Sequence, residues 1–250
     1  MNVRGLPLSG GDARAAAVGS LPADTGSPAA QFVVVPGRMA LLNIDMQNCF
    51  VEGYPMSAPD SLEVLCKINR LASVCRDAGI LVIHTAHVLR ADGSNAGVMR
   101  EFIPAIRGGM INRGSHATAL HRDLVIGPRD IILEKPRFGA FEGTDLDLIL
   151  RAHDIDSVIV SGIATNICCE TTAREAAMRD FRLFFLSDAT ATFDLAGISH
   201  EQIQKTVCAT LTLFGQVLTA DRMLDAITLA VTRDGTRSAA NRLFTKGENV

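Results

Sequence analysis

The 250-residue sequence has little net charge and no long apolar run, and both absences narrow what the protein can do. The formal net charge is -3 at pH 7, so there is no strong basic field to attract nucleic acid or an anionic membrane. No uninterrupted apolar stretch approaches the roughly 18 residues of a membrane span. The N-terminal region lacks the apolar core of a secretion signal. We therefore expect a cytoplasmic protein with neither a nucleic-acid nor a membrane partner.

Two common motifs of metal and cofactor binding are also missing. The six cysteines stand at positions 49, 66, 75, 168, 169 and 208 and include no C-x-x-C pair. Without a secretion signal, this spacing favours reduced thiols over a zinc ribbon or a disulfide framework. No G-x-G-x-x-G follows the first apolar run, so the fingerprint of dinucleotide binding is absent. We therefore predict that the protein uses no cofactor.

Hydrophobic residues make up 48% of the chain and form short apolar runs that alternate with helical patterns. The runs predict strands at 39–45, 80–84, 130–133, 157–160, 181–186 and 216–218. The intervening patterns predict helices at 60–78, 144–152, 167–179, 201–212 and 221–231. Strands that alternate with helices are typical of a parallel sheet covered on both faces. We expect an α/β fold, a three-layer α/β/α sandwich with a mainly parallel, six-stranded, Rossmann-like sheet, over residues 36–231. A flexible arm (1–35) would precede it and a polar tail (232–250) would follow.

One stretch, V-I-V-S-G-I-A-T-N-I-C-C-E-T-T-A-R-E-A-A at 158–177, predicts a buried strand that leads directly into a helix. Thr165 or Asn166 can cap that helix, which places Cys168 in its first turn. Unpaired N–H groups and the helix dipole lower the pKa of a thiol there and can hold an oxyanion. Cys168 is therefore a candidate nucleophile, although a small buried residue in a tight turn is the alternative. Cys169 is expected to face the sheet as a core residue.

Two further reactive side chains stand at predicted strand ends. Asp45 closes the first strand, and Lys135 follows the third. Because the carboxyl ends of parallel strands meet at one edge of a sheet, these side chains and Cys168 can converge there. Taken singly, Asp45 can be a turn cap and Lys135 a surface charge.

These residues carry a resemblance to a known family. The motifs N-I-D-M-Q-N-C-F around Asp45, L-E-K-P-R-F-G-A-F around Lys135 and S-G-I-A-T-N-I-C-C-E-T-T-A-R-E-A around Cys168 resemble those of the isochorismatase-like cysteine hydrolases. The resemblance covers about residues 35–231. It implies an Asp-Lys-Cys triad, a cis peptide bond before Thr165, and a homo-oligomer, either a tetramer or a dimer.

The resemblance also implies a reaction, the hydrolysis of a C–N bond in a small amide. Asp45 would take the thiol proton and later pass it to the leaving amine, while Lys135 holds Asp45 by charge. Cys168 would attack the carbonyl and form a thioester, which water then hydrolyses. Backbone groups at Ala164 and Thr165 would help to hold the oxyanion.

Departures from two branches of the family guide the choice among substrates. Cys168 argues against the true isochorismatases, which cleave a vinyl ether and lack the nucleophilic cysteine. The metal-binding Asp-x-His of the nicotinamidase branch is missing from I-H-T-A-H-V-L-R. His84 and His87 would point to opposite faces of an extended segment, which suits chelation poorly, so we predict ordinary polar packing for both and no metal site.

The branch that remains contains N-carbamoylsarcosine amidases, ureidoacrylate amidohydrolases, biuret hydrolases and maleamate amidases. We therefore expect an amidohydrolase of linear amide, carbamoyl or ureido compounds. The alternatives are a hydrolase of a non-amide substrate, a nicotinamidase-like amidase, and a catalytically silent binding module.

Six residues near the triad are predicted to form the substrate pocket: Asn48, Phe50, Arg90, Phe138, Phe141 and Gln216. Phe138 and Phe141 would form an apolar wall. Arg90 can bind a substrate carboxylate bidentately or belong to a surface ion pair. Gln216 can hydrogen-bond a substrate carbonyl or have a purely structural role.

Overall fold

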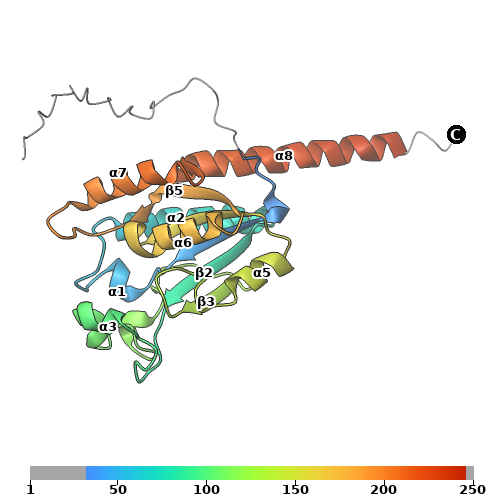
Figure 1. The fold of residues 1–250 in the computed structure, drawn as a ribbon. Helices are drawn as coiled ribbons and strands as arrows, with labels where there is room; N and C mark the ends of the chain where they lie inside the picture. Colours follow the sequence, from blue (N-terminus) through green and yellow to red (C-terminus); the bar gives the residue numbers. More distant parts are fainter. Residues whose placement is uncertain (1–31, 246–250) are drawn as a thin grey trace, which may run out of the picture. The chain divides into compact units, whose positions relative to one another are not determined.

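The computed structural model describes residues 32–245, with side chains as far as residue 233, and its centre is one six-stranded sheet (Figure 1). All neighbouring strands are parallel, in the order β3-β2-β1-β4-β5-β6. The strands are β1 (Met39–Ile44), β2 (Leu81–His87), β3 (Ile131–Lys135), β4 (Ser157–Ile163), β5 (Arg182–Ala191) and β6 (Gln216–Leu218). The expected sheet is therefore confirmed. Its strand order reverses at β1, which puts a crevice at the carboxyl ends of β1 and β4.

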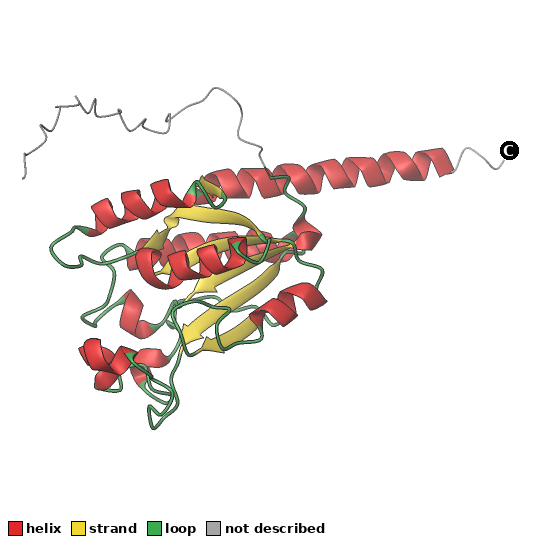
Figure 2. Ribbon diagram, in the orientation of Figure 1, coloured by secondary structure: helices red, strands yellow, loops and turns green. Residues whose placement is uncertain are grey.

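Helices cover both faces of this sheet, which gives three layers (Figure 2). The main helices are α2 (Ser61–Asp77), α5 (Leu146–Ala152), α6 (Glu170–Ala177), α7 (His200–Leu211) and α8 (Ala220–Thr245). Leu41 of β1 packs with Leu71 of α2 and Met223 of α8. Its neighbour Leu42 packs in another cluster with Ala173 of α6 and Leu211 of α7. Adjacent strand residues point to opposite faces, so the continuous apolar run of β1 is explained by burial on both sides.

The connection between β2 and β3 lies beyond the carboxyl ends of the strands, next to α1 (Figure 1). It contains the short helices α3 (Met99–Phe102), α4 (Pro104–Arg107) and η2 (His116–Thr118), and α1 is Asn48–Val51. Ile106 of this connection packs with Phe50 of α1 and Ile163 at the end of β4 in a separate apolar cluster. This long connection therefore forms a wall over the edge of the sheet at which the predicted triad should lie.

Several boundaries differ from those that the sequence predicts. β2 continues to His87 and β5 to Ala191, because pairing with neighbouring strands extends them beyond their apolar runs. The last helix runs to Thr245, so residues 232–245 are helical where a fraying tail was expected. This segment contains no proline to end the helix.

At the N-terminal end of the described residues, Phe32 packs edge-on against Phe184 of β5, with ring centroids 5.9 Å apart. Residues 32–35 therefore belong with the folded part rather than the predicted arm. The rest of that arm (1–31) and the last residues of the predicted tail (246–250) lie outside the described residues. No helix between residues 32 and 245 is long and apolar enough to cross a membrane.

Candidate active site

Lys135 and Asp45 meet at the carboxyl edge of the sheet, although their strands are separated by β2. Lys135 Nζ lies 2.8 Å from Asp45 Oδ2, and neither side chain has any solvent exposure. The same ammonium group donates to the carbonyls of Arg137 at 2.9 Å and Phe138 at 2.8 Å. Burial lowers the pKa of Lys135, but its interactions with Asp45 and Cys168 together outweigh burial, and the net pKa is raised. Lys135 is thus a buried cation rather than a surface charge.

Asp45 is held by its neighbour Thr85 in a conformation that is uncommon for a residue with a side chain. Its φ angle is 50°, in the left-handed region that aspartate tolerates better than most residues. The Asp45 N–H donates to the Thr85 carbonyl at 3.2 Å, and the Thr85 hydroxyl donates to Asp45 Oδ1 at 2.6 Å. Oδ1 is thereby occupied, and Oδ2 pairs with Lys135. Sequence reasoning missed Thr85, although its position next to β1 near the end of β2 was a usable signal.

Cys168 lies in the first turn of the helix that follows β4, as predicted, and is 4% exposed. A side-chain oxygen of Asp45, a ring nitrogen of His87 and the Cys168 sulfur all lie within 4.8 Å of one another. Burial raises the pKa of Cys168, the Lys135 ammonium lowers it, the Asp45 carboxylate raises it, and the net pKa is raised. The expected lowering at a helix N-terminus is therefore wrong, because a dry site and a carboxylate outweigh it. The resting site holds a protonated thiol beside a base.

The turn before Cys168 differs in detail from the prediction. The cis peptide bond joins Ile163 and Ala164, one residue earlier than expected. The helix begins at Thr165 with a wide π-type turn (η3, Thr165–Cys169), and the Ala164 carbonyl accepts from the N–H groups of Ile167 and Cys169, both at 3.1 Å. The oxyanion role of Ala164 and Thr165 stays a prediction.

Cys169 has the role in the core that the sequence indicates. It is fully buried, and its sulfur donates to the Ser161 carbonyl at 3.9 Å. The two adjacent cysteines thus have different surroundings, since Cys168 borders a cavity and Cys169 does not.

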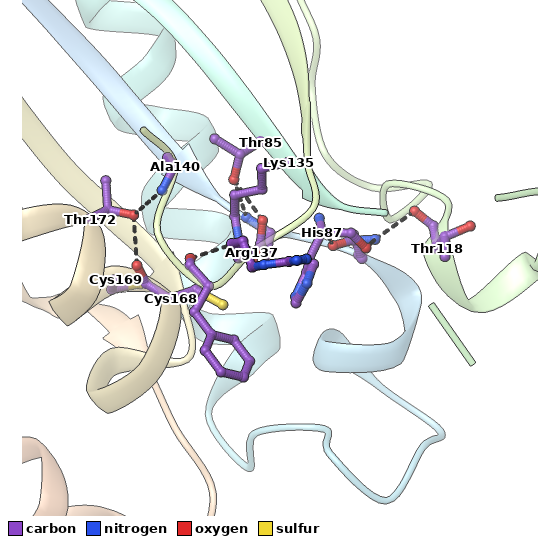
Figure 3. A network of polar contacts seen from close by, with 12 residues as sticks. Thr85, His87, Thr118, Lys135, Arg137, Ala140, Cys168, Cys169 and Thr172 are labelled. Carbon is purple, nitrogen blue, oxygen red and sulfur yellow. Dashed lines mark hydrogen bonds and ion pairs between the residues drawn. The ribbon is translucent and has the colours of Figure 1, made fainter. Parts of the chain in front are cut away.

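Thr172 connects the turn that contains Cys168 to the loop that follows Lys135, as Figure 3 shows. Its hydroxyl donates to the Cys168 carbonyl at 2.7 Å and accepts from the Ala140 N–H at 3.1 Å. Thr172 is fully buried, so neither group has water as a substitute partner. This link fixes the position of Cys168 relative to Lys135, and the sequence analysis did not identify it.

A small cavity of about 60 Å³ opens beside the Cys168 sulfur. It lies between the nucleophile turn, α1 and the long β2–β3 connection. Its lining consists of Phe50, Met56, His87, Ile103, Ile106, Met110, Ile111, Phe138, Ala164, Ile167, Cys168 and Phe193. The cavity therefore includes the predicted Phe50, Phe138 and Ala164, together with an apolar wall that the sequence analysis did not assign.

His87 borders this cavity, contrary to the ordinary polar packing that we expected for it. Its side chain is nearly closed to solvent, and Nε2 has no hydrogen-bond partner. Gln47 fixes the backbone of His87 by accepting from its N–H at 2.7 Å and donating to its carbonyl at 3.2 Å. Burial and the charge of Lys135 lower the pKa of His87 to about 3, so the imidazole is neutral. His84 points elsewhere and does pack as expected, with Nε2 2.9 Å from Asp130.

Four predicted pocket residues are not among those that line the cavity. The Asn48 amide donates to the His116 carbonyl at 2.9 Å. Phe141 packs against Phe181, with ring centroids 5.9 Å apart, in the core. The Arg90 side chain is exposed at the surface. Gln216 opens the edge strand β6 opposite Phe184, at the end of the sheet away from the triad.

The donor atoms of Asp45, His87 and Cys168 are close enough together to hold a thiophilic cation. The Lys135 ammonium group, 2.8 Å from the Asp45 carboxylate, would repel such an ion. The arrangement fits a different use better, in which the carboxylate accepts the thiol proton. The site can therefore activate a sulfur nucleophile next to an apolar cavity.

Comparison with known proteins places this geometry in a family. The family described as "Isochorismatase domain" matches residues 39–222. The chain is 34% identical over 160 residues to an isochorismatase of Bacillus subtilis, which covers 64% of the chain and 50% of that protein. It is 39% identical over 158 residues to nicotinamidase 3 of Arabidopsis thaliana, and the match covers 62% of this chain and 74% of that protein. It is 32% identical over 214 residues to a ureidoacrylate amidohydrolase of Enterobacter sp., and the match covers 77% of this chain and 90% of that protein.

Solved structures agree with this placement. A cysteine hydrolase from Pseudomonas syringae pv. phaseolicola has a TM-score of 0.77 and 31% identity, over 82% of this chain and 99% of the other. An N-carbamoylsarcosine amidase from Thermoplasma acidophilum shares the fold, with a TM-score of 0.59 at 24% identity, over 74% and 97% of the chains. The matches thus cover most of the described domain, including the carboxyl edge of the sheet, where the candidate site lies.

Proposed function

The chain belongs to the isochorismatase family of hydrolases, and we propose that it is a cysteine-dependent amidohydrolase of a small linear amide, carbamoyl or ureido compound. One observation carries the proposal. The fully buried ion pair of Asp45 and Lys135 lies beside the Cys168 thiol, and Cys168 borders a small apolar cavity. A base beside a protonated thiol activates it as a nucleophile by accepting its proton.

In the first half of the reaction, Asp45 accepts the thiol proton as the Cys168 sulfur attacks the substrate carbonyl carbon. The developing oxyanion would be held by backbone N–H groups of the turn at Ala164–Cys168, an effect worth roughly 3 kcal/mol per donor. Asp45 then passes the proton to the leaving nitrogen. The C–N bond breaks, ammonia or an amine departs, and a thioester remains on Cys168.

In the second half, water attacks the thioester while Asp45 takes a proton from that water. The C–S bond breaks, and the thiolate regains a proton from Asp45. Lys135 keeps its charge throughout and stabilises the carboxylate and the thiolate in turn, since its ammonium group is fixed between Asp45 and two backbone carbonyls. The products are an acid, or a carbamate from a ureido substrate, and ammonia or an amine.

The similarity to a ureidoacrylate amidohydrolase over 77% of the chain supports a ureido or carbamoyl substrate. The similarity to nicotinamidase 3 supports amide hydrolysis more generally and keeps a nicotinamidase-like amidase as the second candidate. An isochorismatase-type hydrolase of a vinyl ether has less support, because a vinyl ether offers no carbonyl for Cys168 to attack.

The test is ammonia release from a panel of carboxamides, carbamoyl compounds and ureas, measured with and without a chelator. We expect release that is insensitive to the chelator and is abolished in Cys168→Ala. Cys169→Ala is the matched control, since it removes a neighbouring buried thiol outside the cavity and should retain turnover. Wild-type rates in a folded Cys168→Ala variant would exclude the thioester mechanism.

A further inference from the structure

The lining of the cavity beside Cys168 is almost entirely apolar, and this restricts the substrate further than the reaction does. Of its twelve lining residues, only His87 and Cys168 have a titratable side chain, and the other ten are Phe, Met, Ile or Ala. Ile103, Ile106 and Met110 of the long connection form one wall, and Phe50 of α1 belongs to another. The volume of about 60 Å³ is far below the roughly 300–1,000 Å³ of pockets that hold drug-sized ligands. The substituent that enters is small.

Two cations, Lys135 and Arg137, lie near the cavity, and neither is among the residues that line it. Lys135 pairs with Asp45 and donates to two backbone carbonyls. Arg137 Nη1 donates to the carbonyls of Asn95 at 2.9 Å and Pro136 at 2.7 Å. A carboxylate placed against the apolar wall would lose its hydration and gain no counter-charge, which is costly.

His87 has an unpartnered polar atom at the cavity. Its Nε2 is unpartnered in a side chain that is nearly closed to solvent, and its ring packs edge-on against Phe138, with centroids 5.7 Å apart. The Pro136 backbone, which has only a carbonyl to offer, faces the same ring as a hydrogen-bond partner. A neutral imidazole that donates there through Nδ1 presents a lone pair at Nε2. An unsatisfied buried acceptor beside the nucleophile is matched by an N–H group of a substrate.

We propose that the cavity takes an uncharged amide or urea with a small apolar substituent, oriented by His87 Nε2, which accepts a hydrogen bond from a substrate N–H group. This rests on the proposed function and narrows its substrate class. Arg90, which the sequence offered as a carboxylate ligand, has no part in it.

Matched substrate pairs test the proposal. Isovaleramide and malonamate differ in that a carboxylate replaces an isopropyl group of similar shape, and isobutylurea and N-carbamoylglycine form the equivalent ureido pair. We expect kcat/KM to be at least about 100-fold higher for the apolar member of each pair, because burial leaves the carboxylate unpaired. Equal or faster hydrolysis of the carboxylates would overturn the proposal while leaving the amidohydrolase function intact. If Arg137→Ala then removed that activity, the carboxylate would be assigned to Arg137.

Binding provides a measurement that does not need turnover. Calorimetry with Cys168→Ala should detect isovaleramide and not malonamate. If that binding occurs but the wild-type protein hydrolyses neither compound, the proposed reaction is wrong and the ligand class is right. If isovaleramide and isobutylurea are neither bound nor hydrolysed, the ligand class is wrong.

Two variant pairs assign the effect to residues. Met110→Lys places a cation in the wall and should reduce the preference for isovaleramide over malonamate by about 10-fold or more, whereas Met110→Leu should keep it. His87→Leu should weaken isovaleramide binding by about 5–10-fold, and His87→Gln, which retains an acceptor, should restore part of it. Unchanged affinity in a folded His87→Leu variant would remove His87 from the proposal.

Discussion

Lys135 and Asp45 form an ion pair 2.8 Å long that is closed to solvent on both sides. Such a pair adds little stability compared with apolar side chains at both positions. Removing one partner, however, leaves the other as a buried charge without a counter-charge. The pair is therefore a constraint on both residues at once.

We expect Lys135→Met to lower the free energy of unfolding by about 3–5 kcal/mol, because Asp45 would be left buried without its counter-charge. The double variant Lys135→Met/Asp45→Asn should recover part of this loss. Urea denaturation followed by circular dichroism measures both variants. A Lys135→Met variant as stable as the wild type would show that the pair carries no such constraint.

Gly162 of β4 makes the closest backbone approach at the site. Its φ is +120°, and a Cβ at this position would lie 2.0 Å from the carbonyl oxygen of Ile44, the residue before Asp45. Gly162→Ala should therefore destabilise the protein by about 2–5 kcal/mol and displace Asp45, with loss of turnover. Gly37→Ala is the matched control, since nothing lies within 4 Å of its Cβ position. The pair is compared by thermal unfolding and ammonia release, and wild-type behaviour of Gly162→Ala would contradict the argument.

Thr172→Val removes the hydroxyl that connects Ala140 and Cys168 while keeping its shape. The two buried backbone groups would lose a partner, so we expect a loss of about 1–3 kcal/mol in the free energy of unfolding. We also expect a lower kcat, because the sulfur is less well positioned. Thr206→Val is the control, since its exposed hydroxyl bonds only to Gln202 within α7. Equal effects of the two substitutions would show that the link has no special role.

His87 predicts a pH dependence of stability. Its pKa is about 3 in the folded protein, against 6.5 for an unperturbed imidazole, so the unfolded chain binds a proton first as the pH falls. The stabilisation from the neutral ring is complete above about pH 6.5 and is lost progressively as the pH falls toward 3. Between pH 7.5 and pH 5, the wild type should lose about 2 kcal/mol more than His87→Gln.

Denaturant titrations at several pH values measure this difference. Asp45, Lys135 and Arg137, the other charged groups that act on the ring, are retained in His87→Gln, so their effects largely cancel in the comparison. Parallel pH curves for the two proteins would mean that His87 is protonated as readily in the folded protein as in the unfolded chain.

The sequence predicted the sheet and the three reactive residues because both depend on local patterns. Apolar runs bounded by Gly162 or Asp45 indicate buried parallel strands, and parallel strands end at one edge whatever their order. The position of Cys168 followed from its place after a strand. The strand ends at His87 and Ala191 did not follow, since pairing with neighbours extended β2 and β5 past their apolar runs.

Other features of the site depended on contacts between segments distant in sequence. Thr85, Thr172 and His87 have no motif that distinguishes them from ordinary polar residues. Phe141 and Phe138 are three residues apart in one loop, but one packs in the core and the other lines the cavity. The raised pKa of Cys168 also depends on distant contacts. Burial and Asp45 raise it, whereas the sequence alone indicates only the helix N-terminus, which would lower it.

By itself, then, the sequence determined a parallel α/β sheet and the common edge at which a thiol, a carboxylate and an ammonium group meet. Strand periodicity and residue type are sufficient for that. Only the tertiary structure decided which oxygen of Asp45 faces Lys135, that the cavity is apolar, and that Arg90 and Gln216 lie outside it. Those properties depend on which side chains the long connection brings over the sheet, and no local pattern records that packing.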